Sequence, residues 1–220
     1  HSFPTRRSSD LVKSNYEKYS QVRSTSGKTG REVAEEILHA NGIYDVDVVK
    51  GEGFLTDHYD PNKKVVCLSP ANFDRPSVAG TAIAAHEVGH AIQHQQGYAF
   101  LRFRTALVPL ANIGSSLSYI VIMAGIFLTA LGSAFGSTAL WIGAGLMSLA
   151  VLFSIVTLPV EFDASSRAMK QITALNIVNE KEYKHARKVL SAAAMTYVAA
   201  TATAVAELVR IILLARANDN

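Results

Sequence analysis

The hydrophobic pattern of this chain is dominated by one long run that carries no charge. Residues 105–160 include no Asp, Glu, Lys, Arg or His, and Arg104 and Glu161 bound the run. Since a bilayer span needs about 20 apolar residues, the run is long enough for two spans and a turn. Small residues in the segment GSAFGST indicate the turn, which places the spans near 113–131 and 139–158. The pattern therefore predicts a transmembrane helical hairpin.

A second apolar run, VLSAAAMTYVAATATAVA at 189–206, is rich in Ala and Thr and is followed by Glu207, Arg210 and the segment IILLA. Glu207 and Arg210 stand three residues apart and can pair on a helix. We interpret residues 189–214 as a third transmembrane helix. The alternative is a helix that packs on the first two spans.

The rest of the sequence predicts a soluble part made of helices and short strands. Thr29, with Glu32 three residues later, forms a capping box, and apolar residues at helical spacing lead from it to the stop signal Asn41-Gly42. Alternating apolar and polar residues, with turn residues between them, predict strands at 44–49 and 63–69 and an edge strand within 51–60. We also expect a long helix at 77–96 and polar helices at 163–175 and 180–188. The expected fold class is mainly α with a small antiparallel β-sheet.

Composition narrows the classes of function. The chain has 220 residues, of which 18% are charged, and its net charge of +3 is too small to indicate nucleic-acid binding. Cys67 is the one cysteine of the sequence, which excludes an intramolecular disulfide and a cysteine-based zinc cluster. Residues 1–11, HSFPTRRSSDL, lack helical periodicity and the apolar core of a signal peptide. We interpret them as a disordered or non-native tail.

The segment AAHEVGHAIQHQQGY at 84–98 places three histidines and a glutamate in an otherwise apolar helical run. Residues four apart lie on one face of a helix, so His86 and His90 can present two imidazoles to one metal ion. Glu87 lies beside them and can act as the general base toward a metal-bound water. This HExxH arrangement is typical of zinc metalloproteases. The alternative is a pair of structural histidines on a buried helix.

A catalytic zinc ion takes three protein ligands and keeps one position open. His94 continues the same helix face, but a straight helix places it about 12 Å along the axis from His86, so we expect it beside the site or on the surface. Glu161 is the preferred third ligand, because two spans return the chain to the side on which His90 lies. An unpaired carboxylate at the end of a span would also be costly. Asp163 is the nearest rival.

Several separate motifs resemble one family, the neutral zinc membrane metallopeptidases of the YugP-like group. The motifs are LTDHYDP (55–61), AAHEVGHAIQH (84–94), ALVPLAN (106–112) and LPVEFDASSRA (158–168). The resemblance runs from about residue 19 to residue 214 and implies a gluzincin-type protease, similar in plan to membrane heat-shock and CAAX-processing zinc peptidases. It implies Zn²⁺ as the cofactor, His86, His90 and Glu161 as its ligands, and Glu87 as the base.

The expected organisation combines the motif with the spans. It comprises a zincin-like part with the HExxH helix at 12–104, the transmembrane hairpin at 105–160, cytoplasmic helices with the third ligand at 161–188, and the third span at 189–214. Family members usually begin with an additional transmembrane segment. Residues 1–11 stand in its place, so we expect the chain to be truncated or joined to unrelated sequence there.

Residues around the ligands carry further expectations. Related gluzincins have an aspartate four residues after the ligand glutamate, where this chain has Ser165, so Asp163 is expected to orient a ligating histidine. The candidates for stabilising an oxyanion are Arg167, Tyr183 and His185. The segment around Asp57, His58 and Tyr59 either pairs with an extended substrate strand or forms a structural turn.

The predicted function is that of a membrane-bound zinc metalloendopeptidase. Basic residues flank the spans on the catalytic side, which the positive-inside rule places in the cytoplasm. They are Arg102, Arg104, Arg167, Lys170, Lys181, Lys184, Arg187 and Lys188. The expected partners are the lipid bilayer of the cell membrane and a membrane-associated or unfolded polypeptide substrate. The alternative is a non-catalytic membrane scaffold with a structural metal site, whereas a metal transporter is disfavoured because residues 105–160 hold no ionisable ligand.

Overall fold

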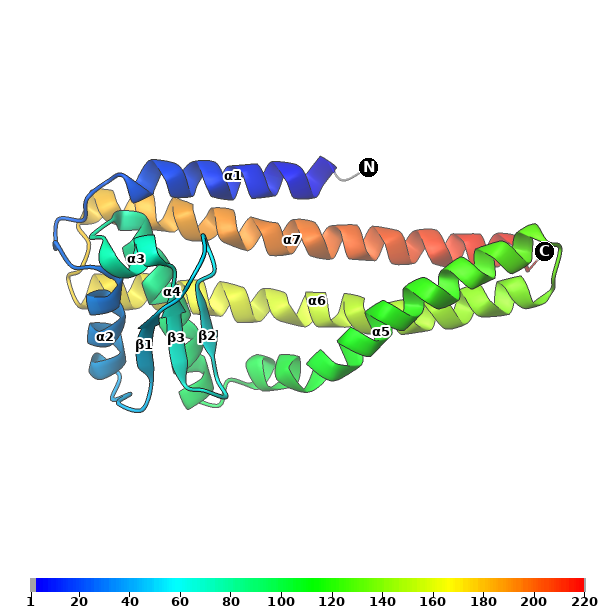
Figure 1. The fold of residues 1–220 in the computed structure, drawn as a ribbon, viewed down its shortest axis with the longest axis horizontal. Coiled ribbons are helices and arrows are strands. Elements are labelled where there is room, and N and C mark those ends of the chain that lie inside the picture. Colours follow the sequence, from blue (N-terminus) through cyan, green and yellow to red (C-terminus); the bar gives the residue numbers. More distant parts are fainter. Residues whose placement is uncertain (1–2, 220) are drawn as a thin grey trace. The chain divides into compact units, whose positions relative to one another are not determined.

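The computed structural model describes residues 3–219 and, within the first helix, the side chains from Asp10 onward. The chain divides into two compact units, whose helices and strands are labelled in Figure 1. The first unit comprises the residues up to Leu101 together with Val160–Thr196. The second comprises Arg102–Pro159 together with the residues from Tyr197 onward. Every candidate site residue named above belongs to the first unit.

The first unit contains a sheet of three short strands in the order β1-β3-β2. The strands are β1 (Asp47–Lys50), β2 (His58–Asp60) and β3 (Val65–Leu68). The predicted small sheet is confirmed, but it is mixed, since β1 pairs with β3 in parallel and only β2 pairs with β3 in the antiparallel sense. A short turn joins β2 to β3 and reverses the chain, whereas the longer segment from β1 to β3 lets both strands run the same way.

Two helices form most of the core beside this sheet. Helix α2 (Gly30–Ala40) begins at the predicted capping box of Thr29 and Glu32, and α4 (Val78–Gln95) begins at Ser77, whose hydroxyl accepts a hydrogen bond from the Gly80 N–H. Between them in sequence lies the short helix α3 (Pro70–Asp74). Fully buried aliphatic and alanine side chains of α2 and α4 share one hydrophobic cluster. The long helix that carries the HExxH motif is therefore a central core element.

Helix α1 spans Phe3–Ser20, so the structure is helical where the sequence predicted a disordered or non-native tail. Its C-terminal half is anchored by Tyr16, whose hydroxyl donates to Asn72 Oδ1 at 3.0 Å, and by Tyr19, which stacks on His185. Once such contacts fix one turn, each further residue extends a helix at little cost. Polar residues without an amphipathic pattern can therefore join this helix.

Among the residues that the structure describes, three helices are long and apolar enough to cross a membrane, which agrees with the three predicted spans. They are α5 (Ala99–Ala130), α6 (Phe135–Ala174) and α7 (Glu180–Ala217). The sequence predicted separate polar helices at 163–175 and 180–188, but residues 163–174 continue α6 to its end and residues 180–188 form the start of α7. The reason is that Pro159 lies inside α6 without a following glycine or polar turn, so it weakens the helix without ending it.

Close backbone approaches join α5 to α6 within the second unit. A Cβ atom placed on Gly114 would lie 2.7 Å from the carbonyl oxygen of Leu146, and one placed on Gly136 would lie 2.6 Å from the backbone nitrogen of Thr129. Small residues of this kind let apolar helices pack tightly where water supplies no driving force. Gly132, with φ of 73°, makes the turn between the two helices. The predicted helical hairpin is thus confirmed as a structural element.

Candidate metal centre

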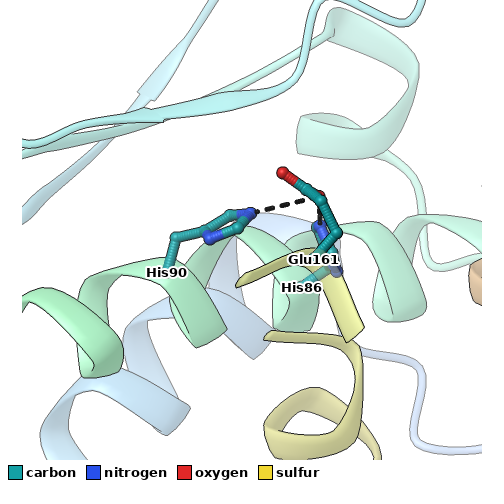
Figure 2. Close-up of side chains that lie close together, drawn as sticks. All are labelled: His86, His90 and Glu161. Carbon is teal, nitrogen blue, oxygen red and sulfur yellow. Dashed lines mark ion pairs between the residues drawn. The ribbon is translucent and has the colours of Figure 1, made fainter. Parts of the chain in front are cut away.

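Three potential metal ligands converge from two helices of the first unit. His86 and His90 project from one face of α4, and Glu161 projects toward both imidazoles from α6, as Figure 2 shows. Oε2 of Glu161 lies 3.3 Å from Nε2 of His86 and 3.6 Å from Nε2 of His90. All three potential ligand atoms lie within 4.8 Å of one another. The structure therefore brings together the three residues that the sequence singled out.

The spacing of these atoms fits a zinc ion. Four ligands at about 2.0–2.1 Å from a tetrahedral zinc are about 3.3 Å apart, close to the two carboxylate–imidazole separations. Imidazole nitrogen and carboxylate oxygen are also the donors that zinc accepts in catalytic sites. The side chains of His86, His90 and Glu161 are 15%, 12% and 6% exposed, so the group is shielded but keeps some access to solvent.

Gly89 explains how α6 comes close enough to α4 for Glu161 to reach the histidines. A Cβ atom at Gly89 would lie 2.6 Å from the carbonyl oxygen of Ala164. No ordinary side chain fits in that space, so the two backbones touch at this point. The absence of a side chain inside the HExxH motif thus sets the distance between the two helices that supply the potential ligands.

Glu87 lies beside the two histidines on α4 and is 9% exposed. Burial raises the pKa of its carboxyl group above the usual value, although His86 and His90 oppose this effect. Burial lowers the pKa of His90, but its contact with Glu161 and the charges of Glu87 and Glu161 outweigh burial and raise that pKa. A raised pKa strengthens a carboxylate as a proton acceptor.

Two residues that hold the histidine rings were not expected from the sequence. The Ser165 hydroxyl lies 3.1 Å from Nδ1 of His86, and Oε1 of Gln93 lies 3.0 Å from Nδ1 of His90. Helical spacing could have identified both, because Gln93 stands three residues after His90 and Ser165 stands four residues after Glu161.

Asp163 has a different role from the one expected, because its hydrogen bonds reach no histidine. Its Oδ2 atom accepts from Nε2 of Gln93 at 2.8 Å and from Nε of Arg167 at 2.5 Å. Arg167 also donates to Oε1 of Gln96 at 2.6 Å and lies over the Tyr98 ring. The guanidinium group is therefore engaged within the protein, which favours a positioning role for Arg167 over contact with an oxyanion.

His94 lies outside the group of potential ligands and pairs with the strand segment instead. The Tyr59 hydroxyl lies 2.8 Å from Nδ1 of His94, which joins β2 to the C-terminal end of α4. His58 is exposed, and its Nδ1 lies 2.8 Å from the carbonyl oxygen of Thr56. Burial raises the pKa of Tyr59 to about 12, so this phenol stays protonated at physiological pH.

Asp57 stabilises the structure of the loop before β2. Its carboxylate accepts hydrogen bonds from the backbone N–H and hydroxyl of Ser69 and from Nδ2 of Asn72. These contacts tie the loop to the start of α3.

Of the expected oxyanion candidates on α7, His185 stacks on Tyr19 with 4.6 Å between ring centroids, and Tyr183 lines a cavity of about 910 Å³ between α6 and α7.

Comparison with known proteins identifies the group to which this arrangement belongs. A family model described as "Putative neutral zinc metallopeptidase" matches residues 7–216. The "Putative membrane protease YugP" of Bacillus subtilis (strain 168) is 44% identical over 203 residues, which cover 92% of this chain and 88% of the relative. No solved structure matches the chain. The chain therefore belongs to the neutral zinc metallopeptidase family, whose cofactor Zn²⁺ is one that the His86, His90 and Glu161 group can hold.

Proposed function

We propose that this protein is a membrane-bound zinc metalloendopeptidase that hydrolyses peptide bonds at the cytoplasmic surface of the membrane. His86, His90 and Glu161 are the proposed zinc ligands, and Glu87 is the proposed general base. The observation that carries the proposal is the convergence of a carboxylate from α6 on two imidazoles from α4, next to a buried glutamate. The resemblance to a membrane protease over most of the chain supports it.

Each residue of the group has a distinct task in the proposed reaction. Zinc, when bound, acts as a Lewis acid toward the scissile carbonyl and lowers the pKa of water. The three ligands occupy three positions and leave the fourth to the reactants. Glu87 takes the proton of the attacking water and later delivers it to the leaving amine. Burial raises the pKa of Glu87, and this stabilises the protonated carboxyl group between the two proton transfers.

The distribution of charge supports a cytoplasmic site. The polar ends of α6 and α7 carry Arg167, Lys170, Lys181, Lys184, Arg187 and Lys188, whereas the segment between α5 and α6 carries no basic residue. Positive residues near the ends of spans are retained in the cytoplasm. A zinc site one residue after the uncharged run would lie close to the membrane surface. Membrane-associated or unfolded polypeptides are therefore the proposed substrates.

The position of β2 supports an extended binding mode for the substrate. In the order β1-β3-β2 the strand has β3 on one side only, so its other edge is open among the described strands. An extended peptide can add to such an edge through backbone hydrogen bonds. His58 and Tyr59 lie on this strand, whereas Asp57 precedes it and is engaged with Ser69 and Asn72.

The decisive experiment replaces Glu87 by glutamine in the full chain and measures both zinc content and casein cleavage. We expect Glu87→Gln to bind zinc and fold like the parent but to lose at least 100-fold in cleavage, the lower end of what a general base contributes. Glu52→Gln, an exposed loop residue, is the matched control and should cleave like the parent. Cleavage by Glu87→Gln at the rate of the parent would favour a non-catalytic membrane scaffold instead.

A further inference from the structure

Gln93 is a fully buried polar residue whose position core packing alone does not explain. It lies on α4 one turn after His90, and its side chain is 0% exposed. A buried carboxamide is costly unless its hydrogen bonds are satisfied. Nε2 of Gln93 lies 2.8 Å from the carbonyl oxygen of Val160 and 2.8 Å from Oδ2 of Asp163, while Oε1 lies 3.0 Å from Nδ1 of His90.

These three contacts determine which end of the carboxamide faces the histidine. The Val160 carbonyl can only accept a hydrogen bond, so the end of Gln93 that faces it and the Asp163 oxygen must be the NH₂ group. Both of its protons are then used. The other end is the oxygen, which can only accept, so Nδ1 of His90 must carry the proton that it donates. The choice of amide orientation, which is often ambiguous, has one solution here.

The consequence for His90 concerns its second nitrogen. A neutral imidazole with a proton on Nδ1 has its lone pair on Nε2. Nε2 is the nitrogen that lies 3.6 Å from the Glu161 carboxylate and belongs to the potential ligand group. Gln93 thus favours the one tautomer that can bind a metal on the side where Glu161 lies.

Asp163 and Arg167 hold Gln93 in turn. The same Oδ2 atom of Asp163 that accepts from Gln93 accepts from Arg167 at 2.5 Å. Arg167 also donates a hydrogen bond to Oε1 of Gln96, the C-cap residue of α4, at 2.6 Å. The chain of contacts therefore runs from α4 to α6 and back, with the guanidinium group of Arg167 hydrogen-bonded to both helices.

We propose that Gln93 is a positioning residue that holds His90 in the metal-binding tautomer, and that the Asp163–Arg167 ion pair fixes the orientation of Gln93. The inference rests on the proposed function only in taking His90 as a zinc ligand. It assigns different roles to the two histidine supports, because the Ser165 hydroxyl beside His86 can either donate or accept. Ser165 holds a ring in place without selecting its tautomer.

The test measures zinc affinity of the full chain by competition with a chromophoric chelator, together with the melting temperature of the metal-free protein. Gln93→Met keeps the length of the side chain and removes its hydrogen bonds. We expect it to weaken zinc binding roughly 10- to 100-fold, the usual loss when a ligand's supporting partner is removed. Gln171→Met is the matched control, because it makes the same substitution at a half-buried glutamine that donates to Asn41 and lies outside the ligand group, so it should bind zinc like the parent. Affinity of Gln93→Met within threefold of the parent would overturn the proposal.

Two further comparisons separate positioning from a general loss of structure. Gln93→Met and Asp163→Ala should be non-additive because they act through one chain of contacts, whereas Gln93→Met and Ser165→Ala should be additive because they support different rings. If Gln93→Met does not fold, the pair Asp163→Asn and Asp163→Ala carries the test. Both substitutions remove the charge, but only asparagine keeps an oxygen that can accept from Gln93. The Asp163→Asn protein should therefore bind zinc more tightly than the Asp163→Ala protein. Equal affinities of the two would overturn the proposal.

A final variant distinguishes this inference from the proposed function. His90→Ala should lose zinc binding if His90 is a ligand. Retention of zinc by His90→Ala would contradict the proposed metal site itself. Loss of zinc by His90→Ala, combined with parent-like binding by Gln93→Met, would contradict only the role of Gln93.

Discussion

The α-carbon of Gly89 faces the carbonyl oxygen of Ala164 so closely that an added methyl group would lie 2.6 Å from that oxygen. The contact joins the middle of the HExxH helix to α6 one turn after Glu161. Because both partners at this point are backbone, neither can move aside without moving its helix. The relationship therefore controls the position of the carboxylate relative to the two imidazoles.

Gly89→Ala should separate α4 from α6 and weaken zinc binding. Overpacking of this kind costs about 1–3 kcal/mol in stability, and we expect zinc affinity to fall along with the melting temperature. Gly145→Ala is the control, because a Cβ atom there meets nothing within 4 Å and alanine favours the helix. Parent-like zinc affinity in Gly89→Ala would show that the helices can separate without loss of the site.

Glu161→Ala should remove one of the three proposed ligands and leave the purified protein with little zinc. His94→Ala should retain a full complement, because His94 is bonded to Tyr59 and lies outside the group of potential ligands. Metal analysis of the two variants, purified side by side, checks both expectations. Full occupancy in Glu161→Ala, or loss of zinc in His94→Ala, would assign the third ligand differently.

Asp57→Ala should destabilise the fold without changing zinc affinity. Removal of the carboxylate leaves the Ser69 N–H without its acceptor and takes one of two acceptors from the buried Asn72 amide, which costs about 1–3 kcal/mol for buried groups. Thermal unfolding of the metal-free protein measures this loss. His58→Ala, an exposed neighbour, should melt like the parent. Equal melting temperatures of Asp57→Ala and the parent would contradict this structural role and favour contact between Asp57 and the substrate.

Glu182→Ala should also destabilise the first unit. The Glu182 carboxylate, 4% exposed, accepts from the backbone N–H and hydroxyl of Thr25 and from the Asn179 N–H. We expect a loss of about 1–3 kcal/mol, measured by denaturant unfolding in detergent. Glu180→Ala removes another acidic residue from the same helical turn but should cost less than about 1 kcal/mol, the usual contribution of a first-turn charge. Similar losses in both variants would contradict this account.

The parts of the structure that were predictable are those with local signals. The capping box at Thr29, the glycine turn in the hairpin and the HExxH spacing each depend on residues within a few positions of one another. Glu161 was predictable for a different reason, since the length of the uncharged run dictates where the chain returns. Each of these signals can be identified from the order of residues alone.

The parts that were not predictable depend on contacts across the fold. The role of Gln93 follows from the Val160 carbonyl and Asp163, which lie far away in sequence. The helical state of residues 3–11 follows from anchoring of Tyr16 and Tyr19 in the core, and the parallel pairing of β1 with β3 from the path of the intervening segment. In each case tertiary packing outweighs the local pattern.

Pro159 has a mechanical consequence for the metal centre. A proline inside a helix removes one backbone hydrogen bond and weakens the turn in which it lies. Glu161 follows two residues later, but contacts with α4 hold this part of α6, because the Val160 carbonyl accepts from Gln93 and the Ala164 backbone lies against Gly89. Pro159→Ala should therefore raise the melting temperature and leave zinc affinity within about threefold of the parent. A larger change in zinc affinity would show that the proline itself sets the position of the carboxylate.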